Sequence, residues 1–341
     1  MSADLLSGWG VSLPVLAAPM AGGPTTPALV SAAAAAGSLG FLAGGYLTAA
    51  RLEEQLLAVR DLPAYGVNLF APNPVPVDPA AYRSYRDLIR GEAGRHGVDL
   101  PAEPLEDDDH WRDKVDLLLA TPPAVVSFTF AVPPPEVVDA FRTAGSLVVQ
   151  SVTSGAEARR AAEAGAEALA VQSTAAGGHW GTLTPTAPSG ETVLTDLLAE
   201  VAAAVDLPLL GAGGLGTPAD VAAAAAAGAL ASMVGTALLL APEAGTSAVH
   251  RAALLAGDRP TAVTRAFTGR PARGLRNAFM DRYGDRAPSG YPALHHLTSP
   301  LRRAAAAAGD PESVNLWAGT GYRSTRERPA AETLRALAAD L

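Results

Sequence analysis

The sequence contains no cysteine and only one lysine, Lys114, among its 341 residues. Without cysteine the chain forms no disulfides, offers no thiolate nucleophile and cannot ligate zinc or an iron–sulfur cluster through sulfur. The lone lysine precedes an expected strand at 124–129 instead of following one. This placement argues against Schiff-base chemistry, which needs a lysine in the site.

Basic segments and membrane-length apolar segments are also missing. The formal net charge is −9 and no basic run occurs, so we do not expect nucleic acid as the main partner. Met1–Gly10 lacks both a basic and an apolar region, so we expect no signal peptide and a cytoplasmic location. The apolar stretch 28–45 is interrupted by Gly37 and Gly40, which predicts helix, turn and strand instead of a membrane span.

The chain instead shows a regular alternation of apolar strand and helix patterns. Hydrophobic residues make up 49% of it, with 34 glycines and 28 prolines, which indicates a large core and many turns. The expected strands are 13–17, 39–43, 65–69, 124–129, 147–152, 168–172, 207–210 and 231–234. Eight such units predict an α/β fold of the TIM (β/α)8 barrel type. A doubly wound sheet is the alternative, but no GxGxxG follows the first strand.

Two segments break the alternation. Residues 71–109 are rich in proline and charge, and we interpret them as an insertion with a helix near Tyr82–Arg90. Residues 241–316 are expected to form a second, smaller, α-rich domain that caps the substrate site. The barrel would then comprise residues 1–240 and 317–341, with the final helix packed back onto it.

The last two expected strands each end in a glycine-rich turn. Gly213-Gly214 and Gly235-Thr236 lie 22 residues apart, and Thr217-Pro218 follows the first turn as a helix N-cap. In TIM barrels the loops after strands 7 and 8 commonly bind phosphate, because backbone N–H groups and a helix N-terminus can approach the anion. Ordinary βα turns are the alternative interpretation, and these glycines alone do not decide between the two.

The expected strand ends carry neutral residues and no Asp, Glu or Lys. A metal-dependent barrel needs several carboxylate or histidine ligands there, and a glycosidase needs two carboxylates. The residues present are Ala18-Pro19-Met20, Asn68, Gln150-Ser151 and Gln172, besides the glycines. Such an opening suits a flat, hydrogen-bonding cofactor with a phosphate tail, and we expect no metal.

One ionisable residue, His179, follows the sixth expected strand between glycines. A near-neutral pKa would allow it to exchange a proton at a cofactor. A loop histidine bonded to a carbonyl is the alternative, but the neighbouring glycines and the position at the strand ends favour the functional interpretation. Among the other histidines, the His295-His296 pair could reach the opening from the second domain. His110 ends an acidic run expected to be a solvated face, and His96 and His250 are expected at the surface.

Several motifs resemble the flavin-dependent nitronate monooxygenases, formerly 2-nitropropane dioxygenases. They are APMAGG at 18–23, YGVNLF at 65–70, VQSTAAGGHWG at 171–181, GAGGLGT at 211–217, VGTALLLAPEAGTS at 234–247, TGRPARGLRN at 268–277 and NLWAGTG at 315–321. The resemblance spans nearly the whole chain and implies a TIM barrel that binds FMN.

The resemblance also implies roles for particular residues. The phosphate would be held by Gly213, Gly214, Gly235 and Thr236, and His179 would be the active-site histidine. The flavin ring would lie along Ala18, Pro19, Met20 and Asn68, and Gln172 would hydrogen-bond the flavin or its ribityl chain. The other expected cofactor-binding residues are Gln150, Ser151, Ala176, Gly177 and Gly178. Some members carry a lysine at the end of strand five, where this chain has Ser151 beside Gln150.

The implied reaction is oxidation of an alkyl nitronate, or of a nitroalkane after proton removal, by O2 to a carbonyl compound and nitrite. Related FMN-dependent reductases, which use NAD(P)H to reduce enoyl thioesters or quinones, are the alternative enzyme class. A flavin- or phosphate-binding protein without catalysis is a third hypothesis. The expected partners are the small substrate and O2, with neither nucleic acid nor membrane, and a homodimer is one hypothesis for the assembly.

Overall fold

Eight parallel strands form the centre of the protein. The computed structural model describes residues 6–187 and 190–341. The strands are β1 (Val15–Ala17), β2 (Phe41–Ala43), β3 (Gly66–Phe70), β4 (Val125–Thr129), β5 (Leu147–Val152), β6 (Ala168–Gln172), β8 (Leu209–Ala212) and β9 (Ala231–Val234). Their order is β1-β9-β8-β6-β5-β4-β3-β2, and a parallel bridge between Ala17 and Gly40 brings the first strand beside the last. The predicted TIM barrel is confirmed.

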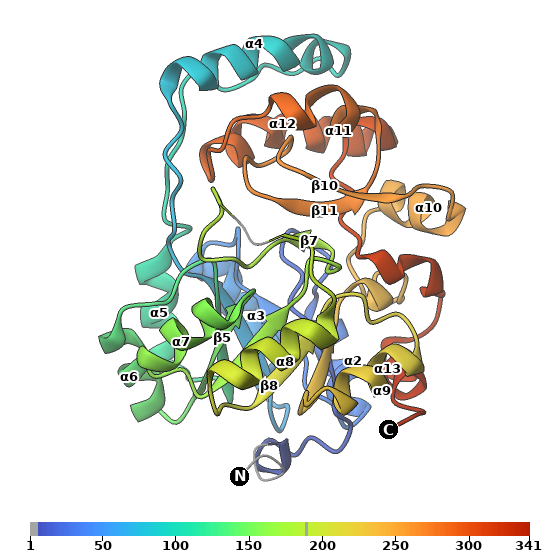
Figure 1. Cartoon of the computed structure of the whole chain (residues 1–341). Helices are drawn as coiled ribbons and strands as arrows, with labels where there is room; N and C mark the ends of the chain where they lie inside the picture. Colours follow the sequence, from blue (N-terminus) through green and yellow to red (C-terminus); the bar gives the residue numbers. More distant parts are fainter. Residues whose placement is uncertain (1–5, 188–189) are drawn as a thin grey trace.

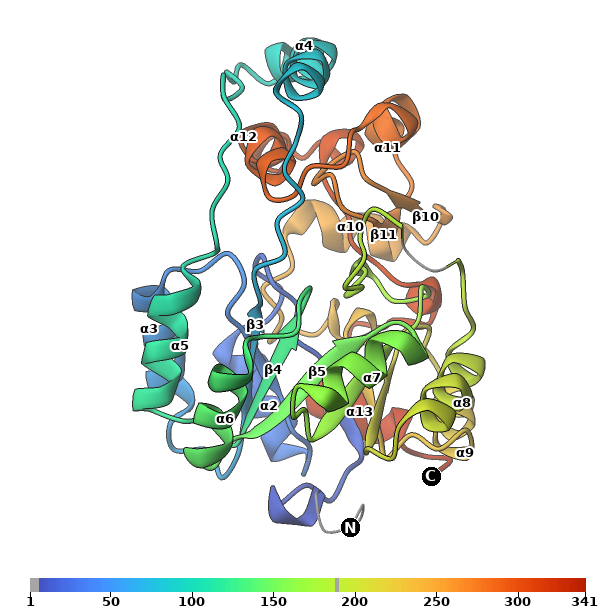
Figure 2. The same ribbon diagram turned by 60° about the vertical axis from the view of Figure 1, so that its left-hand side comes forward.

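Helices surround this sheet on its outer side (Figures 1 and 2). They are α2 (Pro27–Ala35), α3 (Ala49–Val59), α5 (Trp111–Ala120), α6 (Pro135–Thr143), α7 (Gly155–Glu163), α8 (Leu194–Ala204), α9 (Pro218–Ala226) and α13 (Ala330–Leu337). Local capping fixes where several begin. Thr217 forms a capping box with Asp220 at the start of α9, with Pro218 in the first turn, as the sequence predicts.

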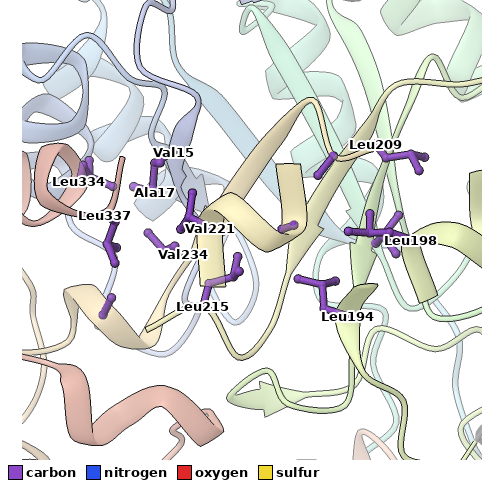
Figure 3. Packing of buried hydrophobic residues seen from close by; sticks show 14 of the residues in the cluster. Val15, Ala17, Leu194, Leu198, Leu209, Leu215, Val221, Val234, Leu334 and Leu337 are labelled. Atoms are coloured by element: carbon purple, nitrogen blue, oxygen red, sulfur yellow. The ribbon is translucent and has the colours of Figure 1, made fainter. Parts of the chain in front are cut away.

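Alternate residues of each strand face two different cores. In β1, Val15 and Ala17 pack against the outer helices, whereas Leu16 faces the barrel interior. Figure 3 shows the outer core, where Val15 and Ala17 lie beside Leu334 and Leu337 of α13. Strands buried on both sides appear in the sequence as continuous apolar runs, which explains why the barrel strands could be predicted.

A second layer covers the carboxyl ends of the strands. It contains α10 (Ala248–Ala256), α11 (Ala278–Tyr283) and α12 (Ala293–Ala307), and it also holds a small antiparallel sheet, β10-β11-β7. The strands of that sheet are β10 (Thr261–Thr264), β11 (Ala272–Leu275) and β7 (Gly178–His179). The layer is therefore not made of helices alone, because β11 pairs with the two-residue β7 from the barrel loop.

The predicted insertion forms α4 (Pro79–Arg95), which is longer than the expected helix and packs on this second layer (Figure 1). The Tyr85 hydroxyl donates to the carbonyl of Ala266 at 2.6 Å. The buried Glu92 pairs with Arg282 and accepts from the Tyr283 hydroxyl at 3.0 Å. Residues from two distant parts of the sequence thus share one core, and we call this layer, α4 included, the cap. Within the described residues no helix is long and apolar enough to cross a membrane.

Candidate active site

A cavity of about 820 Å³ lies between the carboxyl ends of the barrel strands and the cap. This is the face on which TIM-barrel enzymes place their active sites, and the volume lies in the range of small-molecule sites. The sequence-predicted residues that line it are Ala18, Pro19, Met20, Asn68, Ser151, Gln172, Ala176, Gly177, Gly178, His179, Gly213, Gly214, Gly235 and Thr236. One predicted residue, Gln150, does not line it.

Gln150 is excluded by strand geometry. Successive residues of a strand point to opposite faces, so only one of the neighbours Gln150 and Ser151 can face the barrel interior. Ser151 does so, and its hydroxyl lies 3.1 Å from the Thr129 hydroxyl. The Gln150 amide is buried and donates to the carbonyls of Phe128 at 3.2 Å and Ser151 at 3.1 Å.

One end of the cavity is lined by glycine-rich backbone. Gly213 and Gly214 adopt φ of 106° and 79°, a region that side-chain-bearing residues rarely enter, just before α9. A Cβ on Gly213 would lie 2.5 Å from the Ser173 hydroxyl, so there is no room for a side chain. The Thr236 hydroxyl accepts from the backbone N–H of Gly319 at 2.9 Å. This end can receive an anionic group such as a phosphate.

The barrel floor carries neutral amides. The Asn68 amide nitrogen donates to the hydroxyls of Ser127 at 2.9 Å and Thr129 at 3.0 Å, while within the described residues Oδ1 accepts no hydrogen bond. Gln172 donates to the carbonyl of His179 at 3.2 Å and accepts from the N–H of Gly181 at 2.6 Å. Gln172 therefore holds the histidine loop, and the Asn68 oxygen remains available to a ligand.

His179 is positioned by both layers of the molecule. It stands opposite Ala272 in the pairing of β7 with β11, which ties the barrel loop to the cap. Its Nε2 lies 2.8 Å from the Thr268 hydroxyl. The ring is enclosed by three aromatic rings with centroids 5.6–5.8 Å away, those of Phe130, Tyr291 and Trp317.

This environment changes the acidity of His179. Burial among these rings, with smaller contributions from the positive charges of Arg270 and Arg302, lowers its pKa to about 3. This direction differs from the near-neutral pKa expected from the sequence. His179 is neutral at physiological pH, so it can donate or accept a hydrogen bond but is a weak base.

Two guanidinium groups near His179 have neutral hydrogen-bond partners. Arg302 donates to the Thr298 hydroxyl at 3.0 Å, the Asn315 side-chain oxygen at 3.1 Å and the carbonyl of His295 at 3.0 Å. Burial lowers its pKa to about 10, so it stays charged at neutral pH. Arg270 lies over the Phe130 ring at 3.9 Å. The charges of these two guanidinium groups therefore favour an anion beside His179, whereas Asp107–Asp109 line the cavity on the side of Tyr46.

Several lining residues could not be predicted as site residues. They are Tyr46 after the second strand, Thr268, Tyr291 and Arg302 of the cap, and Trp317 of the C-terminal segment. Only the TGRPARGLRN and NLWAGTG motifs gave a signal, and neither assigned a role to these residues. His295 does reach the cavity, as considered from the sequence.

The other histidines differ from expectation. His250 lines the cavity and is 7% exposed, so its expected surface position is wrong. His96 is also half-buried, and its Nε2 lies 3.1 Å from the Asp310 carboxylate. In the acidic run before His110, residues 106–108 are exposed as expected, but Asp109 is mostly buried beside Lys114.

A capped cavity with a glycine-rich end and a neutral polar floor defines a TIM-barrel enzyme with a site for a small organic ligand. Residues 5–340 match the family model described as nitronate monooxygenase. A nitronate monooxygenase of Pseudomonas aeruginosa is 35% identical, and a probable one of Bacillus subtilis is 31% identical. The alignments cover 97% of this chain and 97% and 96% of those relatives, respectively. The chain belongs to the nitronate monooxygenase family, a family of flavoenzymes, and is a flavin-dependent oxidoreductase.

Solved structures agree with this assignment. The nitroalkane oxidase of Streptomyces ansochromogenes superposes with a TM-score of 0.91 at 41% identity, covering 98% of this chain and 97% of that one. FabK of Thermotoga maritima superposes with a TM-score of 0.74 at 24% identity, covering 98% and 93%. The likeness to FabK shows a shared fold alone.

Proposed function

We propose that the protein binds FMN in this cavity and oxidises alkyl nitronates with O2 to a carbonyl compound and nitrite. One observation carries the proposal. The same cavity has a glycine-rich end and, elsewhere along its wall, a neutral His179 among aromatic rings and guanidinium groups. Membership of the nitronate monooxygenase family supports the same reaction.

The residues fit a flavin mononucleotide. The phosphate would lie against Gly213, Gly214, Gly235 and Thr236, and the ring along Ala18–Met20 and Asn68, whose Oδ1 is available to accept a hydrogen bond. Gly319 and Gly321 of the C-terminal segment complete the glycine-rich end. When bound, FMN supplies the electron-transfer chemistry, while the protein orients it and the substrate. Gln150 would not contact the flavin, and its amide would only hold the backbone at Ser151 through a hydrogen bond to the Ser151 carbonyl.

The electrostatics favour a nitronate over the neutral nitroalkane. A nitronate is already an anion, and the charges of Arg302 and Arg270 stabilise an anion beside His179. Removal of a proton from a neutral nitroalkane needs a base whose pKa is near the working pH, and the pKa of His179 is about 3. We therefore infer that His179 mainly orients the substrate by hydrogen bonding, and that neutral nitroalkanes react more slowly.

One preparation of purified protein tests both parts of the proposal. The protein should be yellow, acid should release FMN, and incubation with propionate 3-nitronate in air should consume oxygen and form nitrite. Release of FAD, or a colourless protein, would contradict the cofactor assignment. A yellow protein that forms no nitrite from any alkyl nitronate would contradict the reaction.

A further inference from the structure

Tyr46 lines the cavity in an unusual backbone conformation. Its φ is 67°, in the left-handed region that bulky residues rarely adopt. Its ring stacks on the His295 ring of α12, with centroids 4.1 Å apart and planes 4° apart. Its hydroxyl lies 3.4 Å from the Tyr291 hydroxyl, and Tyr291 in turn touches His179. Tyr46 therefore forms a wall of the cavity that joins barrel to cap.

A buried charged pair holds this residue in place. The N–H of Tyr46 donates to Asp109 Oδ1 at 2.9 Å. The other carboxylate oxygen, Oδ2, accepts from Lys114 Nζ at 2.6 Å, and Nζ also donates to the carbonyl of Gly44 at 2.9 Å. Lys114 is 1% exposed. Asp109 and Lys114 thus bind both ends of the Gly44–Tyr46 turn.

The same acidic turn also reaches the cap. Asp107 Oδ2 lies 2.8 Å from Nε2 of His296, the neighbour of the stacked His295. Asp107 Oδ1 accepts from the N–H of Asp109 at 3.3 Å. Residues 107–109 therefore contact the barrel turn on one side and α12 on the other, at the edge of the cavity.

Fold stability alone does not explain such a pair. Removing two charges from water costs free energy that their attraction only partly repays, so an apolar pair of similar volume would often be as stable. A positioning role accounts for both the carboxylate and its partner. Asp109 accepts the N–H that the left-handed Tyr46 presents, and Lys114 orients and neutralises Asp109.

We propose that Asp109, oriented by Lys114, is a positioning residue that fixes Tyr46 against His295 and Tyr291. It thereby sets the width of the cavity beside His179 and limits the bulk of the alkyl nitronate accepted. The inference about substrate bulk rests on the proposed function, whereas the positioning of Tyr46 does not.

Two double variants isolate the hydrogen bond to Tyr46. Asp109→Asn with Lys114→Met removes both buried charges but keeps an acceptor oxygen at residue 109. Asp109→Ala with Lys114→Met removes the charges and the acceptor, so neither variant has an unpaired buried charge. The control is Asp113→Asn, which removes the charge of an exposed residue at the start of α5. We would measure KM and kcat for ethyl nitronate and for a branched nitronate, and backbone hydrogen exchange over residues 44–47.

We expect the alanine variant to show a KM for ethyl nitronate roughly 5-fold or more above that of the asparagine variant, because the unsatisfied N–H of Tyr46 no longer fixes the turn and the cavity wall can move. Its kcat should change little, its preference for the smaller nitronate should fall, and exchange at residues 44–47 should be faster. Asp113→Asn should match the wild type.

Equal KM values and equal exchange in the two double variants would overturn the proposal. If the wild type oxidised no nitronate, the proposed function would fail, and hydrogen exchange alone would still decide whether Asp109 positions Tyr46.

Discussion

At the scale of single residues, the chemistry depends on what surrounds His179. Its loop is held by Gln172, its strand by β11 and its Nε2 by Thr268. These contacts fix the ring without giving it a carboxylate partner. A histidine in this setting stays neutral and donates or accepts a hydrogen bond, which suits a substrate that arrives as an anion.

Replacing His179 by asparagine tests whether it acts by hydrogen bonding, as proposed, or as a base. If it acts by hydrogen bonding, turnover of a neutral nitroalkane should fall by about 10-fold or less, whereas loss of a catalytic base would lower it by roughly 10²- to 10⁴-fold. Turnover of a pre-formed nitronate should fall by about 10-fold or less, because only a hydrogen bond is lost. Steady-state oxygen consumption with matched nitroalkane and nitronate measures both.

FMN content is the control for that variant, since the phosphate is assigned to the glycine-rich end, away from His179. Unchanged flavin with no loss of turnover on either substrate would mean that His179 is a structural loop residue. Loss of flavin would mean that it contributes to cofactor binding instead.

At the scale of elements, the loop after β6 is anchored by α7. Glu157 in the first turn of that helix is 5% exposed and accepts four hydrogen bonds. Two come from the N–H and hydroxyl of Thr153, at 2.6 and 2.8 Å. The other two come from the Thr182 hydroxyl and the Leu183 N–H, both at 2.7 Å. A barrel helix thus holds the segment that follows His179.

Glu157→Gln should therefore lower the free energy of unfolding by roughly 2–4 kcal/mol, because the amide NH2 would face groups that donate. Urea unfolding measures the change. The matched control is Glu163→Gln, an exposed residue of the same helix, which should change stability by less than about 0.5 kcal/mol. Equal effects of the two variants would show that Glu157 does not anchor the loop.

The same elements show what the sequence could and could not predict. The barrel strands and the glycine-rich turns were predicted because apolar runs and turn residues are local signals. Gln150 and Ser151 could not be distinguished, because the register of a strand buried on both faces leaves no alternation to read. Arg302 and Tyr291 reach His179 only through the packing of the cap, and no local pattern encodes that approach.

At the scale of the whole molecule, the buried histidines make stability depend on pH. Burial lowers the pKa of His250 to about 4, that of His179 to about 3 and that of His295 well below its usual value. Between these values and about pH 6.5 the unfolded chain binds more protons than the folded one. Stability should therefore rise with pH across this window and be lost as the pH falls.

His250 gives the clearest case because it is almost fully buried. Its shift corresponds to a loss of about 2 kcal/mol in unfolding free energy between pH 7.5 and pH 5. His250→Gln should lose correspondingly less over the same interval, measured by urea unfolding at the two pH values. An identical pH dependence in variant and wild type would contradict a neutral, buried His250.

We expect the cavity to receive electrons from a nitronate and not from a nicotinamide. The sequence contains no dinucleotide fingerprint after its first strand, and the charge beside His179 favours a small anion. Anaerobic stopped-flow mixing of the purified flavoprotein with propionate 3-nitronate and with NADH or NADPH distinguishes the two electron donors. We predict rapid loss of oxidised-flavin absorbance with the nitronate and slow loss with either nicotinamide. Rapid reduction by a nicotinamide, with none by the nitronate, would rule out nitronate oxidation and indicate an FMN-dependent reductase.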